Sequence, residues 1–341
     1  MAARTTATNT DESERGLLDR FKRQATYLRL SVTDRCDLRC SYCMPEDDVD
    51  RRHRSEILGF EEIAHLIRLF VASGVEAVRI TGGEPLLRRD LPRLVAMLSD
   101  LPGLRDLSLT TNATRLAEQA PALRAAGLQR INISLDSLSP KRFSAITRGG
   151  DLGRVLRGID TAVRVGFQPI KLNAVVLAGI NDDEAADLVR FAGRIGAQMR
   201  FLEAMPLGAV GGANHERFVP NATTLAHLRR EFDLEPVPLL PGTTAQEFRV
   251  VETGAIVGFV SPVSDRFCST CNRLRLSCQG YLQLCLAHED GVDLKSPLRL
   301  GATDADLRAL IRTAVYRKPE GNRFEESAEP VYQISMVRIG G

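Results

Sequence analysis

The sequence lacks any long hydrophobic run. Nothing within its 341 residues approaches the roughly eighteen consecutive apolar residues that a membrane-spanning helix needs. Residues 1–15 also lack the apolar core of a signal peptide, and they carry acidic residues, in which targeting presequences are poor. We therefore expect a soluble, cytoplasmic protein with no membrane partner, in which residues 1–16 form a flexible arm without chemistry of its own.

A strong net charge is lacking as well. The chain has 45 lysines and arginines against 43 aspartates and glutamates, so no overall field attracts nucleic acid. Arginine greatly outnumbers lysine, and its forked guanidinium suits anionic ligands that are bound bidentately. The composition favours a small anionic ligand over a nucleic-acid partner.

An even cysteine framework is also missing, because the chain has 7 cysteines. In a cytoplasmic protein, cysteines more often bind metals or act in catalysis than form disulfides. The grouping of these cysteines therefore carries more information than their number.

Short β-branched or apolar runs alternate with amphipathic segments along residues 27–203. The predicted strands are Tyr27–Val32, Ala77–Thr81, Asp106–Thr110, Arg130–Leu135, Ile170–Leu177 and Met199–Glu203, and the predicted helices are Glu61–Ala72, Leu91–Leu98, Arg115–Ala126, Leu152–Val165 and Glu184–Ile195. Repeated strand–helix units indicate an α/β fold with a parallel sheet, here a partial (β/α)6 barrel rather than a closed eight-stranded one. Its site would lie at the carboxyl ends of the strands, where the polar segments 81–85, 110–112 and 134–137 follow, although each of these could also be an ordinary turn.

The alternation stops in the Gly-rich stretch from Pro206 to Asn214. We therefore predict a barrel domain over residues 17–207 and a second domain over 208–341. The second domain contains a hairpin-like pair, Glu247–Glu252 and Ala255–Ser261, and a helix around Asp304–Val315.

The first cysteine group puts Cys36, Cys40 and Cys43 directly after the first predicted strand. A structural zinc site takes four ligands, and neither a fourth cysteine nor a histidine at familiar spacing completes this set; His53 lies farther on in a charged stretch. Soft thiolates select iron–sulfur clusters, and three cysteines on a four-iron cube leave one iron open. The Cys-x3-Cys-x2-Cys spacing, with the aromatic Tyr42 inside it, resembles the radical S-adenosylmethionine (SAM) superfamily, in which SAM occupies that iron.

The segment Gly82-Gly83-Glu84-Pro85 extends this resemblance, because in the superfamily this loop holds the amino group and methionine moiety of SAM. Glycine lets the main chain approach a ligand closely, and a buried carboxyl or carbonyl oxygen can accept from an ammonium group.

The second cysteine group consists of Cys268, Cys271 and Cys285, with Cys278 between them. Taken from the residues alone, a zinc ribbon that uses all four is an open alternative. Cys278 lies in the strand-like stretch Leu274–Cys278, where it could equally be a small buried hydrophobe.

The chain resembles the GTP 3′,8-cyclase family of molybdenum cofactor biosynthesis over nearly its whole length, from the segment Leu28–Cys36 to the terminal Gly340-Gly341. The resemblance implies that Cys268, Cys271 and Cys285 hold a second [4Fe–4S] cluster whose open iron faces GTP, with Cys278 outside the ligand set. It also implies a C-terminal iron–sulfur domain that closes the open side of the barrel, and a Gly-Gly tail that enters the active site in an undetermined role.

The resemblance further implies a radical SAM lyase with two [4Fe–4S] clusters and SAM as cofactors. The first cluster reduces SAM to methionine and a 5′-deoxyadenosyl radical, the radical removes the ribose 3′ hydrogen of GTP, and the substrate carbon attacks guanine C8. The product is (8S)-3′,8-cyclo-7,8-dihydro-GTP. Expected partners are GTP, SAM, a reductant such as flavodoxin or ferredoxin, and the downstream cyclic pyranopterin monophosphate synthase, and the assembly could be a homodimer.

Site residues follow by the same resemblance. SAM contacts fall on Tyr42, Gly83, Ser134 and Met205, and GTP contacts fall on Arg29, Arg79, Thr110, Lys171, Arg273, Leu274 and Arg275, with Arg273 and Arg275 assigned to catalysis. A triphosphate carries about four negative charges, and arginine matches phosphate oxygens bidentately. Arg79, Lys171 and Arg200 lie on different predicted strands, so a barrel could bring them together, although a lone strand arginine is more often an ion-pairing group.

Two rival functions stay open. A radical SAM peptide-modifying enzyme with an auxiliary cluster usually has more cysteines in its C-terminal half and needs no arginines beside the ligands. A non-catalytic iron–sulfur or zinc protein has no use for an open iron, a SAM loop or a triphosphate cradle.

Overall fold

The computed structural model describes residues 16–46, 53–239, 242–322, 324 and 336. Its centre is one sheet with the strand order β12-β11-β10-β1-β2-β3-β4-β5-β6-β9-β8-β7. The first six strands are β1 (Tyr27–Ser31), β2 (Ala77–Thr81), β3 (Asp106–Thr111), β4 (Arg130–Ser134), β5 (Ile170–Val176) and β6 (Gln198–Glu203). Each pairs in parallel with the next, which confirms the predicted parallel sheet of a partial barrel.

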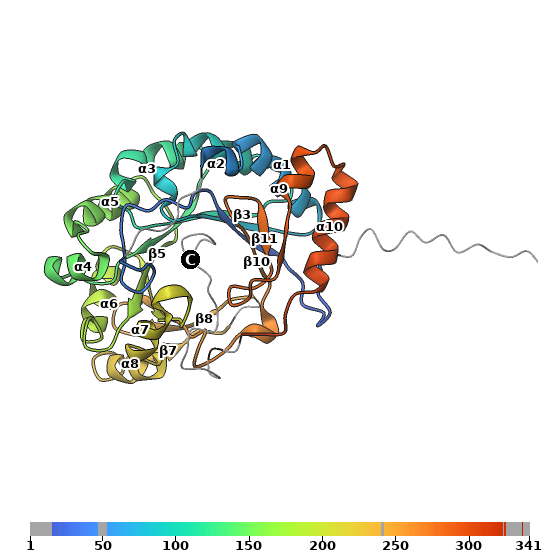
Figure 1. Ribbon diagram of the computed structural model, residues 1–341. Helices are drawn as coiled ribbons and strands as arrows, with labels where there is room; N and C mark the ends of the chain where they lie inside the picture. Colours follow the sequence, from blue (N-terminus) through green and yellow to red (C-terminus); the bar gives the residue numbers. More distant parts are fainter. Residues whose placement is uncertain (1–15, 47–52, 240–241, 323, 325–335, 337–341) are drawn as a thin grey trace, which may run out of the picture.

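Helices cover the outer face of these strands, as Figure 1 shows in the arc from α1 to α6. Their bounds are α1 (Phe60–Ala72), α2 (Leu91–Ser99), α3 (Leu116–Ala125), α4 (Pro140–Thr147), α5 (Leu152–Arg164) and α6 (Ala185–Arg194). Five of the six match the predicted helices to within one or two residues at each end. The exception is α4, which begins at a Ser139 cap followed by Pro140 and for which no helix was predicted.

The C-terminal part contributes to both edges of this sheet. On one edge, β9 (Ile256–Val260) pairs in parallel with β6 and is followed outward by β8 (Ala245–Val250) and β7 (Leu234–Pro236). On the other edge, β10 (Arg273–Leu276) pairs in parallel with β1 and is followed by β11 (Tyr281–Gln283) and β12 (Gly291–Asp293). The strands after residue 207 therefore extend the barrel sheet at both edges rather than form a separate sheet. The resemblance led us to expect a C-terminal domain on the open side of the barrel, and these are the edges at which it attaches.

In its described residues, the C-terminal part also contains the α-helices α7 (Gly211–Glu216), α8 (Asn221–Leu228), α9 (Lys295–Arg299) and α10 (Asp304–Tyr316). The last confirms the helix predicted around Asp304–Val315, and it begins at a capping box in which Thr303 and Asp306 satisfy each other's free backbone N–H groups. None of the helices in the described ranges is long and apolar enough to cross a membrane.

The alternation of side chains along each strand decides what faces the interior of the barrel. On β5, the apolar Leu172 and Ala174 are buried under the helices, whereas the intervening Lys171 and Asn173 line a cavity on the other face. On β1, Leu28 and Leu30 enter the core and Arg29 lines the cavity. The helix-facing core is therefore apolar, and the inner face of the sheet is free to carry polar chemistry.

Candidate active site

A cavity of about 590 Å³ lies on the inner face of the sheet. Its walls include side chains from every strand from β1 to β6, together with residues of the C-terminal part. The six cysteines of the two predicted ligand groups also line it. Two groups that are more than 200 residues apart in the sequence therefore open onto one chamber.

The first cysteine group lies in the loop after β1. Amides of Cys43 and Met44 donate to the Cys40 carbonyl at 2.9 and 3.0 Å, and Ser41 N donates to the Ile146 carbonyl in α4 at 2.9 Å. The loop is thus folded back on itself and attached to the barrel wall. All three thiols face the cavity, as the spacing predicts.

The electrostatics of this loop suit metal ligands rather than a free nucleophile. Burial raises the pKa of Cys36 and Cys43 to about 12, and nearby carboxylates add to it: Asp136 at Cys43, and Glu84 and Asp37 at Cys36. The pKa of Cys40 is raised for the same reasons, burial first and then Asp136. Such thiols keep their protons until a metal displaces them.

The glycine loop after β2 packs directly on the cysteine loop. Gly83 N donates to Thr33 O at 2.7 Å, and Glu84 N donates to Arg35 O at 2.7 Å. A Cβ on Gly83 would lie 2.3 Å from Arg35 O and 3.0 Å from Cys36 N, so only glycine fits this approach. The close contact explains the two glycines, and Gly83 lines the cavity beside Cys36.

The carboxylate of Glu84 is hydrogen-bonded to other groups of the protein. Its carboxylate accepts from Leu86 N at 3.0 Å, Thr111 Oγ1 at 2.7 Å and Asn112 N at 2.7 Å. Burial raises its pKa to about 7. Its side chain therefore fixes the glycine loop to the end of β3.

Hydrogen bonds of Asp136 and Asn214 fix the position of Tyr42 at the edge of the cavity. The Tyr42 hydroxyl donates to Asp136 Oδ2 at 2.8 Å, and Val175 N donates to Asp136 Oδ1 at 2.9 Å. Asn214 in α7 donates through Nδ2 to the carbonyls of Tyr42 and Met205, both at 2.9 Å. Sequence analysis included Asp136 in the polar segment 134–137 that follows β4 but gave it no role of its own, and it assigned no role to Asn214.

The second cysteine group occupies the loop before β10 and the segment after β11. Cys271 N donates to Cys268 O at 3.2 Å within a short 3-10 turn, Cys268–Thr270. Burial alone would raise the pKa of the Cys271 thiol, but the charges of Lys318, Arg273 and Arg23 and a backbone hydrogen bond lower it below its usual value. The surroundings of this group are thus basic, in contrast to the acidic surroundings of the first.

Cys278 does not join that group. It lies at the end of β10 with 2 % of its surface exposed, it does not line the cavity, and burial raises its pKa to about 12. Its position fits a small buried hydrophobe, the reading that the sequence offered beside ligation.

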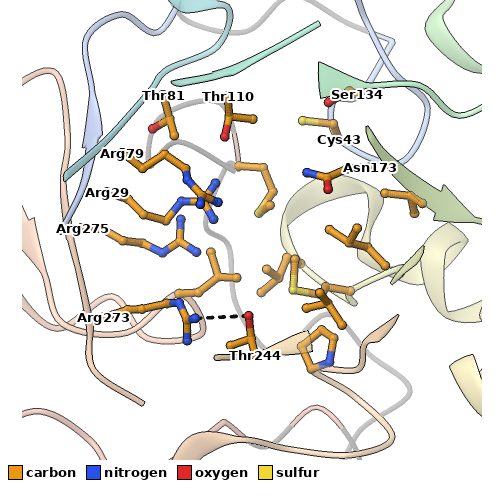
Figure 2. Close-up of a pocket in the computed structure, with 18 of the residues that line it drawn as sticks. Arg29, Cys43, Arg79, Thr81, Thr110, Ser134, Asn173, Thr244, Arg273 and Arg275 are labelled. Atoms are coloured by element: carbon orange, nitrogen blue, oxygen red, sulfur yellow. Dashed lines mark hydrogen bonds between the residues drawn. The ribbon is translucent and has the colours of Figure 1, made fainter. Parts of the chain in front are cut away.

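The basic residues form a layer across neighbouring strands. Arg29 on β1 is in register with Arg79 on β2 and Arg275 on β10, and Tyr27 on β1 is in register with Arg273. Figure 2 shows the four guanidiniums one beside another, pointing from the strands into the pocket, with Arg273 donating to Thr244 Oγ1 at 3.1 Å. Burial lowers the pKa of Arg275 to about 10 and that of Arg29 well below its usual range, and in both cases a neighbouring arginine contributes.

Two further cations lie farther along the sheet, Lys171 on β5 and Arg200 on β6. Lys171 Nζ is 3.7 Å from Glu247 Oε1, and Arg200 Nη2 donates to the same oxygen at 3.1 Å. Burial lowers the pKa of Lys171 to about 8, and the charge of Arg200 adds to this. Together with the four arginines, Arg130 and Lys318, these two cations bring eight basic side chains to one cavity, which could hold a polyanion.

The remaining predicted residues divide as follows. Thr110, Ser134 and Met205 line the cavity, and Figure 2 shows Ser134 and Cys43 opposite the arginines. Leu274 differs, because its side chain is fully buried in the core and the residue is not among those that line the cavity. Gly340 and Gly341 lie outside the described residues, and His53 is exposed and bonded to Ser55, away from the cavity.

Side chains that sequence reasoning missed include Asn112, Asn173, Thr244 and Lys318, all of which line the cavity. Only Asn112 carried a signal, as part of the polar segment after β3. The other three depend on strand register or on loops that approach from the C-terminal part.

The donor sets fit iron–sulfur clusters. Each is three soft thiols facing a shared cavity, and within the described part of the chain no three His, Cys, Asp or Glu side chains are arranged to hold a single metal ion. A four-iron cube takes each thiolate on a different iron, so its cysteines need not converge on one point.

Comparison with known proteins follows the same division of the chain. Residues 30–192 match the radical SAM superfamily, and residues 197–324 match the family described as Molybdenum Cofactor Synthesis C. The chain is 46% identical over 336 residues to the GTP 3′,8-cyclase of Pseudomonas putida, covering 97% of this chain and 100% of that protein. It is 42% identical over 330 residues to the GTP 3′,8-cyclase of Hydrogenovibrio crunogenus, covering 95% and 99%.

Among solved structures, Streptococcus suis SuiB bound to S-adenosylmethionine superimposes with a TM-score of 0.60 at 14% identity, covering 92% of this chain and 77% of that one. At this identity the match shows the fold alone, and it confirms the predicted radical SAM architecture.

Proposed function

The chain belongs to the GTP 3′,8-cyclase family within the radical SAM superfamily, and we propose that its single cavity holds SAM and GTP between two iron–sulfur centres. As a member of that family it is a radical SAM enzyme of molybdenum cofactor biosynthesis. The observation that carries the proposal is that both cysteine triads open onto the same chamber as a group of basic side chains that includes Arg29, Arg79, Arg273 and Arg275.

The proposed ligands are Cys36, Cys40 and Cys43 for one [4Fe–4S] cluster, and Cys268, Cys271 and Cys285 for the other. When bound, the first cluster supplies the electron that cleaves SAM, and the second offers an open iron to the substrate. Because each triad has three thiols, each leaves one coordination position for a small molecule. The first triad lies beside the glycine loop and the second beside Arg273 and Arg275, which supports our proposal that SAM binds at the former and GTP at the latter.

The residues around the first triad would bind and orient SAM. Gly83 packs its main chain against the start of the first triad, and Ser134, Met205 and Tyr42 line the same cavity. Asn214 keeps the Tyr42 and Met205 carbonyls at a fixed separation. This arrangement would place the reactive carbon of SAM toward the middle of the cavity, where it reaches one substrate hydrogen and few others.

The residues of the GTP side neutralise charge. We propose that Arg29, Arg79, Arg273, Arg275 and Lys171 take the triphosphate, with Arg200 as a sixth cation and Thr110 on the same wall. A bound triphosphate of about four negative charges would relieve the mutual repulsion of these cations, so binding energy and charge compensation coincide. Leu274 would contribute through its main chain only. Fixing the triphosphate at this end leaves the ribose and base toward the two triads.

The wider setting follows the family. We propose a flavodoxin- or ferredoxin-type reductant, transfer of the product to cyclic pyranopterin monophosphate synthase, cytoplasmic location, and functional division of the chain near residue 207. A homodimer is tested by sedimentation.

The test is anaerobic reconstitution followed by chromatography of 5′-deoxyadenosine and GTP after addition of dithionite, SAM and GTP. We expect wild type to consume GTP, and Cys285→Ala to lose GTP conversion together with one cluster's iron. Cys278→Ala is the matched control and should retain both clusters and turnover. SAM cleavage without GTP loss in the fully loaded wild type would contradict the substrate assignment, and equal iron loss in both cysteine variants would contradict the second ligand set.

A further inference from the structure

A short segment after α10, residues 318–322, lies directly against the second cysteine group. A Cβ on Gly321 would be 3.2 Å from the Cys268 Cβ, and Asn322 Nδ2 lies 3.7 Å from the Cys268 sulfur. The segment is therefore packed on the proposed ligand loop, and its polar groups are aimed at it.

Lys318 is the most buried charged group of this segment. Only 2% of its surface is exposed, and its Nζ contacts three atoms: Arg273 O at 2.7 Å, Leu284 O at 2.7 Å and the Cys271 sulfur at 3.6 Å. Leu284 immediately precedes Cys285. One amine thus joins a thiol, the start of β10 and the segment that carries another ligand.

The position of Lys318 is itself fixed by the segment that follows it. Arg23 donates to the carbonyls of Pro319 at 2.5 Å and Glu320 at 2.6 Å, and to that of Cys268 at 2.7 Å. Asp19 holds the Arg23 guanidinium through Nε at 2.6 Å. A buried ion pair near the N-terminal end of the described chain therefore clamps residues 318–320 onto the cysteine loop.

A buried amine at this distance from a thiolate has a definite electrostatic consequence. Taking a cation out of water is costly, and such a group persists where it offsets negative charge and has its donors satisfied. A cluster held by three thiolates becomes more negative when it gains an electron, so a fixed cation beside one thiolate favours the reduced form. The first triad has acidic neighbours instead, so the two centres would differ in this respect.

We propose that Lys318 is a positioning residue of the second metal centre, which holds the two ligand-bearing segments together and raises the reduction potential of that centre through its charge. The inference rests on the proposed second cluster. The electron comes from an external reductant, here dithionite, and the oxidised reductant balances the step.

The experiment isolates the second centre in the full chain. In a Cys36→Ala, Cys40→Ala, Cys43→Ala background, only a cluster on the second triad contributes to the EPR signal. Potentiometric titration then compares four proteins: this background alone, and the same background with Lys318→Arg, Lys318→Gln or Lys295→Met. Lys295 is the matched control, because its amine also donates to a main-chain carbonyl, that of Glu56 at 2.8 Å, and it does not line the cavity.

We expect Lys318→Gln to lower the equilibrium constant for one-electron reduction by about tenfold, or ~59 mV. Lys318→Arg should restore most of the shift because it keeps the charge, and Lys295→Met should have no effect. An unchanged potential in Lys318→Gln overturns the proposal.

Two other outcomes are also decisive. If Lys318→Gln loads no cluster while Lys318→Arg loads it, the charge is needed for assembly and the proposal stands; equal loss in both variants overturns the role of charge. If the triple-alanine background protein with Lys318 intact binds no cluster, the second ligand set is wrong and this inference falls with it. SAM cleavage by the wild-type protein would still test the first triad separately.

Discussion

Replacement of Arg29 should have opposite effects on stability and on ligand binding. Arg29 is in register with Arg79 and Arg275 on the strands to either side, and neighbouring strands lie about 4.8 Å apart. Burial lowers its pKa well below the usual range, and the charges of Arg275, Arg79 and Arg273 add to this effect. In the protein without ligands, Arg29 is therefore held among like charges.

The expected magnitude follows from Coulomb's law. Two unit charges about 6 Å apart at an effective dielectric constant of about 20 repel each other by roughly 3 kcal/mol, and counterions reduce this. Loss of the guanidinium's polar interactions and of packing by the side-chain stem offsets much of the gain, by about 1.5–3 kcal/mol. We expect Arg29→Met to stabilise the cluster-free, ligand-free protein by about 1 kcal/mol net.

The same change should weaken GTP binding. Removing one charge-assisted phosphate contact costs about 2–3 kcal/mol, which corresponds to a loss in affinity of roughly 30- to 150-fold. Urea unfolding of the cluster-free protein measures the first quantity, and calorimetry with GTP on the loaded protein measures the second. Arg105→Met is the control, because Arg105 is exposed and forms only a surface pair with Glu76, so both quantities should stay nearly constant.

A variant that is less stable than the wild type without ligand would refute the reasoning. It would mean that Arg29 is held by attractive contacts stronger than the repulsion between guanidiniums, and that the layer is a structural element first. Unchanged GTP affinity would instead remove Arg29 from the proposed phosphate cradle.

Three further predictions concern other parts of the site. Gly83→Ala should abolish SAM cleavage and lower the free energy of unfolding by about 1–3 kcal/mol, because the new methyl group would overlap Arg35 O. Calorimetry and the formation of 5′-deoxyadenosine test these two effects. SAM cleavage by the variant at the wild-type rate would contradict the prediction. Asn214→Ala should raise the KM for SAM roughly 5- to 100-fold, since two rim carbonyls lose their shared donor, whereas GTP affinity should not change; a shift in GTP affinity alone would count against this placement. The affinity for tripolyphosphate should fall as the pH rises through about 8, because Lys171 then loses the proton that makes it a cation. Lys171→Arg should flatten this dependence of affinity on pH, since arginine keeps its charge. An equally steep dependence in that variant would show that another group titrates.

The sequence predicted the barrel strands closely because each has an apolar face that must be buried. Leu172 and Ala174 alternate with Lys171 and Asn173, and this alternation fixes both the strand and its inward face. The predicted bounds of β2 coincide with the observed ones, and those of β1 and β3 differ by one residue.

The edges of the sheet were not predictable in the same way. Nothing local in Arg273–Leu276 indicates that it pairs with β1 in addition to its neighbour in sequence, β11, because long-range pairing partners are set by the tertiary fold. For the same reason, the cysteines were found by their spacing, whereas Lys318 and Asn214 carry no spacing signal and are recognised only by their contacts. Leu274 is the opposite case, because the family motif predicted it as a GTP contact, whereas the alternation of side chains along β10 buries its side chain in the core.

The position of β10 beside β1 also has a consequence for how the chain folds during synthesis. Asn272 reaches back across 246 positions to hydrogen-bond Thr26, and the strand pair begins one residue later on each side. At about 5–20 residues per second, a ribosome needs on the order of ten to fifty seconds between the emergence of β1 and that of its edge partner. During that time the hydrogen-bonding edge of β1 is open to other chains. Nascent copies should therefore bind general chaperones until residue 276 has left the exit tunnel, and a chain truncated before Arg273 should aggregate even though all six βα units of the barrel are present.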